Sequence, residues 1–205
     1  MVRTGDSIRA AVEALAQRET AFANVVERHG IPEPRRSDPG AHTLLRTIVG
    51  QQVSIAAAAS VWRKLEALLG EDIPPHALLA ADFDALRACG LSRQKQGYAR
   101  SLCELVVSGE LDLAHLPADD EEAIAQLVRI KGIGRWSAEI YLLFAEGRHD
   151  IWPAGDLAVQ AGIARILGLP ERPSEKAARD LAERWRPHRG AVAIFTWHCY
   201  NNPAL

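Results

Sequence analysis

The 205-residue sequence has few cysteines, and the three that it has, Cys89, Cys103 and Cys199, are far apart along the chain. No two of them have the short spacing of zinc or iron–sulfur ligands, and three are too few for a disulfide framework. We therefore expect no iron–sulfur cluster, no required cofactor and a reducing compartment, namely the cytoplasm, with association to the nucleoid if the source is bacterial.

Long apolar runs and strand-like alternation are also missing. No stretch reaches the ~18 consecutive apolar residues of a membrane span, and charged residues interrupt the N-terminal segment, so neither a membrane partner nor a signal peptide is expected. Apolar residues recur instead with helical spacing, in segments separated by Gly or Pro. This pattern predicts an all-α fold of about ten helices with short connections. The expected helices span about residues 7–28 (as one or two), 41–53, 54–69, 75–80, 82–89, 92–107, 119–127, 135–146, 156–167, 174–186 and a final stretch through 197.

An excess of positive charge is missing as well, because the net charge is -2 although 24% of the residues are charged. Any contact with a nucleic acid must therefore come from local basic clusters. Such clusters are equally typical of solvated helix faces. Three are present, formed by Arg93, Lys95 and Arg100, by Arg129, Lys131 and Arg135, and by Arg184, Arg186, His188 and Arg189.

The turn Gly132-Ile133-Gly134 lies between two predicted helices. Two residues without Cβ allow positive φ and a close approach of the backbone to a ligand. The N–H groups of the helix beginning near Arg135 would then face the same anion, and Lys131 and Arg135 would add charge. A dinucleotide site is excluded, since no βαβ unit surrounds the turn. The pattern predicts a helix-hairpin-helix that grips a DNA phosphate; a plain corner between two helices is the alternative.

Four segments carry a family resemblance: residues 48–54 (IVGQQVS), 132–138 (GIGRWSA), Pro153 with Asp156, and 183–187 (ERWRP) closing on Trp197. Together they resemble the DNA-3-methyladenine glycosylase II family of the helix-hairpin-helix, Gly/Pro-Asp DNA glycosylase superfamily, over about residues 41–200. The resemblance implies a two-lobed helical fold. One lobe would span 41–135 and the other 1–40 with 136–205, with the base pocket in the cleft between. The chain looks like a short form without the N-terminal β domain of the best-known bacterial members.

The resemblance also implies site residues. Asp156 would be the catalytic carboxylate, which stabilises the positive charge that develops on the sugar as the glycosidic bond breaks. Asp156 is equally suited to be the N-cap of the helix that follows it, and the two roles are compatible. Trp136 and Trp197, with Trp152 as a weaker choice, would hold a cationic base by cation–π attraction. Trp62 and Trp185 are expected in the core.

Trp136 stands where members that also cut the DNA backbone carry a lysine nucleophile. The resemblance therefore implies a monofunctional, monomeric enzyme without lyase activity that acts on double-stranded DNA with a damaged base. We expect it to release alkylated purines of the 3-methyladenine and 7-methylguanine type. The alternatives are a glycosylase for deaminated or mismatched bases such as uracil or hypoxanthine, and a DNA-binding module without catalysis.

After a base has flipped out, a side chain must fill the gap in the duplex. By resemblance, Gln51 lies at the duplex interface, and either Leu91 or Arg93 inserts from the loop at residues 90–95; a capped helix start with solvated basic residues is the other reading of this loop. The backbone carbonyls of Val128, Ile130 and Ile133 would hold a structural Na+ or K+ at the hairpin.

Overall fold

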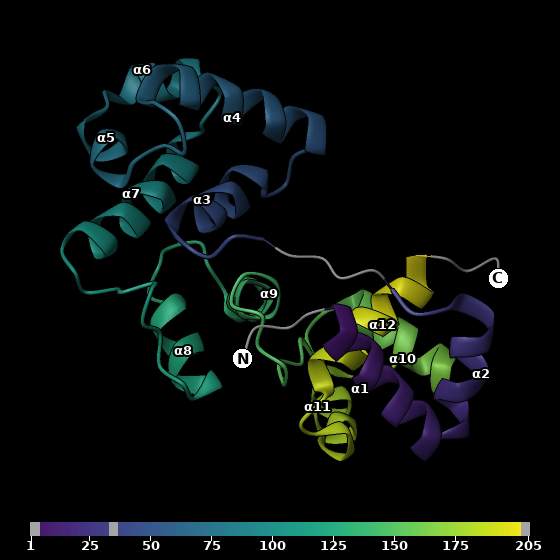
Figure 1. Ribbon diagram of the computed structural model, residues 1–205. Helices are drawn as coiled ribbons and strands as arrows, with labels where there is room; N and C mark the ends of the chain where they lie inside the picture. The colour runs from purple at the N-terminus through teal and green to yellow at the C-terminus, as the bar shows by residue number, and fades with distance from the viewer. Residues whose placement is uncertain (1–4, 33–36, 202–205) are drawn as a thin grey trace. The chain divides into compact units, whose positions relative to one another are not determined.

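The computed structural model describes residues 5–32 and 37–201, and every regular element in these ranges is helical (Figure 1). The all-α prediction is therefore confirmed. Ten of the twelve described α-helices have more than six residues. The elements are α1 (Gly5–Arg18), α2 (Thr20–His29), α3 (Ala41–Gly50), α4 (Ile55–Leu69), α5 (Pro75–Ala80), α6 (Phe83–Ala88), α7 (Arg93–Val107), α8 (Asp120–Leu127), α9 (Arg135–Phe144), α10 (Leu157–Leu167), α11 (Glu175–Ala182), the 3₁₀ helix η1 (Glu183–Trp185) and α12 (Arg189–Asn201).

Capping side chains start six of the described α-helices, namely α4, α6, α7, α8, α10 and α11. The Ser54 hydroxyl accepts a hydrogen bond from the Ala57 N–H at the start of α4, and Asp119 accepts one from Glu122 at the start of α8. Such caps satisfy N–H groups that have no partner within the helix. Some boundaries differ from the prediction: the helix expected over 174–186 divides into α11 and η1, and α3 ends at Gly50 instead of continuing to residue 53, because Gln51 takes a ψ of 130° and Gln52 a positive φ of 55°.

The chain divides into two compact units. One comprises the described residues of Met1–Arg36 and Leu142–Leu205, the other those of Ser37–Tyr141, and the second boundary falls within α9. In the first unit α10 packs on α12, and α1 and α2 pack on each other and on α12. Its core is rich in aromatic rings, with Phe22 against Trp185 at 5.7 Å and Phe195 at 6.1 Å between ring centroids.

The second unit is built around α7, which packs against α3 and α5, while α3 also packs on α4. Its core is aliphatic, with Leu44, Ile48, Leu65 and Leu102 fully buried. Burial of such side chains contributes about 1.5–3 kcal/mol each relative to exposure. This unit carries the glycine turn between α8 and α9, whereas the first unit carries Asp156.

Candidate active site and DNA-binding surface

Asp156 lies at the end of the loop between α9 and α10 and is the N-cap of α10. Its Oδ1 atom accepts hydrogen bonds from the backbone N–H groups of Ala158, at 2.8 Å, and Val159, at 2.9 Å. The cap predicted from the sequence is therefore present. These N–H groups and the positive end of the helix dipole stabilise negative charge on the carboxylate. The arrangement gives a fixed anionic oxygen at the start of a helix.

Trp197 is brought to this carboxylate from a distant part of the chain. Its indole Nε1–H, on α12, donates to Oδ1 of Asp156 at 3.2 Å. The Trp197 ring also lies beside the ring of Phe144, with centroids 5.7 Å apart and planes inclined by 31°. The first unit therefore places two aromatic rings and a carboxylate together. Sequence reasoning missed Phe144, although it follows Trp136 by eight residues, or about two helical turns.

Trp152 has a different place from the one expected. Only 3% of its surface is exposed, its Nε1–H donates to the Ala178 carbonyl at 3.0 Å, and its ring packs edge-on against Trp185. Because both the ring and its N–H are used within the core, Trp152 offers no face to a base, which corrects its assignment to the base pocket. Trp62 and Trp185 are buried, as predicted.

The helix-hairpin-helix predicted around Gly132 is formed by α8, the turn and α9. Ile130 and Ile133 are buried beneath the turn, and the Ile133 N–H donates to the Ile130 carbonyl at 3.0 Å. Gly132 has a φ of 82°, and a Cβ on it would come within 2.2 Å of the Tyr98 ring. Backbone conformation and packing therefore both require glycine at this position.

Gly134 differs from Gly132, although the sequence suggested the same reason for both. It does not have a positive φ, and a Cβ placed on it would meet no atom within 4 Å. Its carbonyl accepts the first backbone hydrogen bond of α9, from Ala138. The absence of a side chain here leaves open space over the N-terminus of α9, where an anion is favoured.

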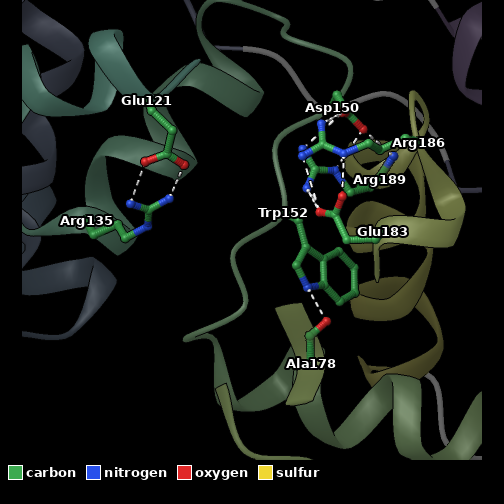
Figure 2. A network of polar contacts seen from close by, with 8 residues as sticks. All are labelled: Glu121, Arg135, Asp150, Trp152, Ala178, Glu183, Arg186 and Arg189. Atoms are coloured by element: carbon green, nitrogen blue, oxygen red, sulfur yellow. Dashed lines mark hydrogen bonds and ion pairs between the residues drawn. The ribbon is translucent and has the colours of Figure 1, made fainter. Parts of the chain in front are cut away.

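The basic cluster of the hairpin is only partly available to a ligand. Lys131 is exposed. The Arg135 guanidinium, in contrast, binds both carboxylate oxygens of Glu121 (Figure 2) and donates through Nε to Glu139 at 2.9 Å. The hydrogen bonds with Glu121 are the main reason why the pKa of Arg135 is raised. The Arg135 side chain is therefore held in an ion pair within its own unit, and its assignment as a phosphate ligand stays a prediction. Arg129 likewise pairs with Glu110, at 2.8 Å.

The three insertion candidates have different environments. Leu91 is 1% exposed and its carbonyl accepts a hydrogen bond from Gln96, so it belongs to the core and its assignment as an inserting residue is corrected. Gln51 donates from Nε2 to the Gly132 carbonyl at 2.8 Å and so ties the end of α3 to the hairpin. Arg93 is exposed at the start of α7. Sequence reasoning missed Ile55, whose side chain follows the Ser54 cap and is 91% exposed.

The ligands proposed for a monovalent cation lie on the turn. The Ile130 carbonyl already accepts from Ile133, but a carbonyl oxygen has two lone pairs and keeps the capacity for a second partner. The cation at Val128, Ile130 and Ile133 stays a prediction. Elsewhere in the described ranges, no group of three His, Cys, Asp or Glu side chains is arranged to hold a metal ion.

The three cysteines are buried free thiols. Burial raises the pKa of Cys103 and of Cys199 to about 12. Since the thiolate is the reactive form, neither group is suited to act as a nucleophile.

Residues 45–187 match the HhH-GPD superfamily base excision DNA repair protein family. DNA-3-methyladenine glycosylase 1 of Schizosaccharomyces pombe is 32% identical over 158 residues, which are 75% of this chain and 69% of that protein. The crystal structure of a DNA-3-methyladenine glycosidase from Bacillus halodurans superimposes with a TM-score of 0.86 at 31% identity, covering 95% of this chain and 90% of that one. A 3-methyladenine DNA glycosylase of S. pombe in complex with abasic DNA has a TM-score of 0.80 at 29% identity, covering 94% and 97% of the two chains.

None of the helices within residues 5–32 and 37–201 has the length and apolar character that crossing a bilayer requires.

Proposed function

Because the chain belongs to the HhH-GPD superfamily of base excision DNA repair proteins, we propose that it is a monofunctional DNA N-glycosylase that removes alkylated purines from duplex DNA. The observation that carries this proposal is the pairing of Asp156 with Trp197, a fixed carboxylate hydrogen-bonded to an aromatic ring. The relatives named as 3-methyladenine glycosylases support the substrate class. The enzyme is expected to act as a monomer, in the cytoplasmic compartment that holds the DNA.

The chemistry requires a negative charge close to the sugar. As the bond between C1′ and the base nitrogen breaks, positive charge develops on the sugar, and the Asp156 carboxylate stabilises it or orients the attacking water. A 3-methyladenine or 7-methylguanine base is cationic in DNA and leaves as a neutral molecule. It therefore needs little help from a general acid. The Trp197 ring favours such a cation by about 0.5–2 kcal/mol.

We propose no lyase activity for this protein, because of the residue at position 136. A lyase step needs an amine that forms a Schiff base with the sugar, and by resemblance Trp136 stands where that lysine would be. The Trp136 side chain is 47% exposed at the start of α9, so we assign its ring to the damaged nucleotide. Lys131 is assigned to a DNA phosphate at the hairpin, together with the open backbone at Gly134.

Asp156→Asn tests the proposal. Asparagine is as good an N-cap as aspartate, so the variant should keep the hydrogen bonds to Ala158 and Val159 and fold normally while losing the charge. The rate of release of methylated purines from duplex DNA under single-turnover conditions should fall by about 10²–10³-fold, the cost typical of losing one electrostatic contact in a transition state. Circular dichroism and thermal melting serve as the control for folding.

The same assay decides against the proposal in two ways. If a folded Asp156→Asn variant released methylated purines at the wild-type rate, the Asp156 carboxylate would have no part in bond cleavage. If the wild-type protein instead releases uracil or hypoxanthine but no methylated purine, the substrate class is wrong. Binding to the duplex with no base released from any substrate would indicate a DNA-binding module.

A further inference from the structure

A network of two arginines and two carboxylates lies in the first unit, and nothing in the proposed chemistry uses it. The Arg189 guanidinium binds the Asp150 carboxylate through two parallel hydrogen bonds, from Nε to Oδ1 and from the second terminal nitrogen to Oδ2, both at 2.9 Å. Arg186 donates to Oδ2 of Asp150 at 2.7 Å, and Glu183 accepts from both arginines (Figure 2). We call these four residues the Asp150 clamp.

The Asp150 clamp joins two segments that each carry a residue of the candidate active site. Asp150 precedes Asp156 by six residues in the loop, and Arg189 is the first residue of α12, eight residues before Trp197. The Arg189 N–H also donates to Oδ1 of Asp150, at 3.2 Å. The loop and the helix are therefore linked in two places. One is at Asp150 and Arg189, next to which the Gly190 N–H also donates to the His149 carbonyl at 3.0 Å, and the other is at Asp156 and Trp197.

The loop between these two links has little freedom. Trp152 is held to the Ala178 carbonyl, and the buried Gln160 side chain donates to the Ala154 carbonyl at 2.7 Å. Since both intermediate points are held by hydrogen bonds inside the protein, a shift at Asp150 cannot be absorbed by the loop alone. It must move Asp156, α12 or both.

The burial of the Asp150 clamp distinguishes it from ordinary surface ion pairs. The side chains of Arg189 and Asp150 are 11% and 19% exposed, whereas those of the surface pair Lys176 and Asp180 are 86% and 65% exposed. A planar guanidinium bound at two points fixes direction as well as distance, which a lysine ammonium does not. The contact is therefore suited to set a geometry.

We propose that Arg189 and Asp150 are positioning residues that hold the Asp156 carboxylate and the Trp197 ring in their working arrangement. The inference rests on the proposed glycosylase function. Arg189 and Asp150 act through the loop and α12 without touching the substrate. Their loss lowers the rate of bond cleavage and leaves the binding of duplex DNA unchanged, because the hairpin that binds DNA belongs to the other unit.

Arg189→Lys tests this, since it keeps the charge and loses the two-point contact. Single-turnover release of methylated purine should fall by about 10²-fold, the effect that a misplacement of about 1 Å can have, while the affinity for an abasic-site duplex stays at the wild-type value. The indole N–H resonance of Trp197, assigned in ¹⁵N-tryptophan-labelled protein with a Trp197→Phe variant, should shift. A residue needed only for stability would change the melting temperature without moving this resonance in the folded protein.

Two further variants complete the design. Arg186→Gln removes one donor to Asp150 from a half-exposed side chain; it keeps the fold and should give the same two effects at smaller size, so the test stands even if Arg189→Lys fails to fold. Lys176→Met, in the surface pair, should change neither the rate nor the resonance. The proposal is overturned if the folded variants of the Asp150 clamp cleave at the wild-type rate or leave the Trp197 resonance in place. A wild-type protein that releases no base refutes the glycosylase function instead, and the resonance then decides the positioning role alone.

Discussion

The surroundings of Asp156 and the surface of the hairpin differ in how far their polar groups are exposed to solvent. Around Asp156 the polar side chains face one another, and Asp150 with Arg189 is largely buried. At the hairpin the turn shows its backbone to solvent, with Gly132, Gly134 and Lys131 all exposed. Bond cleavage needs a fixed geometry, whereas capture of a phosphate needs accessible N–H groups and charge. The two regions therefore differ in the way that the proposed division between bond cleavage and DNA binding requires.

Arg135 shows that this contrast does not follow from residue type. It lies at the hairpin among residues expected to bind phosphate, yet its two-point contact with Glu121 resembles that of Arg189 with Asp150. A carboxylate paired with a basic residue lowers the positive charge that this residue presents to a ligand. The hairpin therefore presents less positive charge than its sequence suggests.

Of the substitutions Trp197→Phe, Gly132→Ala and Lys131→Gln, which compare the two regions, Trp197→Phe should have the largest effect, on the rate of base release. It keeps a ring beside Phe144 and removes the hydrogen bond to Asp156. A hydrogen bond to a charged group contributes about 1.5–3 kcal/mol, so base release should slow by about 10- to 100-fold. Affinity for duplex DNA, measured by fluorescence anisotropy, should not change. A loss of affinity as large as the loss of rate would contradict the separation of the two regions.

Gly132→Ala should have an intermediate effect, on stability and DNA binding together. The alanine would need a φ of 82° and would collide with the Tyr98 ring, which should lower the free energy of unfolding by about 1–3 kcal/mol. Gly134→Ala is the matched control, because its methyl group would enter open space. Chemical denaturation should show wild-type stability for Gly134→Ala, while its DNA affinity falls. Equal destabilisation by both substitutions would mean that the turn requires two glycines for folding alone.

Lys131→Gln should have the smallest effect, visible mainly in the salt dependence of binding. Loss of one phosphate contact changes the slope of log K against log salt concentration by about 0.9. Arg135→Gln should leave that slope unchanged, because its charge is already paired with Glu121 and Glu139. It should instead lower stability, since the Glu139 side chain is only 3% exposed and would lose a partner. If both variants changed the slope equally, Arg135 would bind a DNA phosphate as Lys131 does.

Local signals in the sequence were reliable. The helices expected from residues 54 and 119 begin there, at the caps Ser54 and Asp119, and the glycine turn followed from the spacing of Gly132 and Gly134, because these features depend on atoms within a few residues of one another. The family resemblance drawn from short segments is confirmed by the match over residues 45–187. The placement of Asp156 as a helix cap was correct for the same local reason.

Errors occurred where distant residues decide the environment. Trp152 and Leu91 are ordinary candidates by type and position, yet both are buried, and Trp152 donates to the carbonyl of Ala178, 26 residues further along the chain. Arg135 forms an ion pair with Glu121, fourteen residues earlier, and no spacing in the sequence predicts this contact. The burial of one particular side chain depends on packing between elements, which short-range spacing does not describe.

By itself, the sequence determined the helices, the hairpin and the identity of the acidic residue at the start of α10, because caps, glycines and apolar spacing act locally. Only the tertiary structure decided which tryptophan meets Asp156, which arginine is neutralised, and that Asp150 is tied to Arg189. Each of these contacts joins residues from separate elements, and the hydrogen bonds that hold them form only when packing has excluded water and brought the partners within reach.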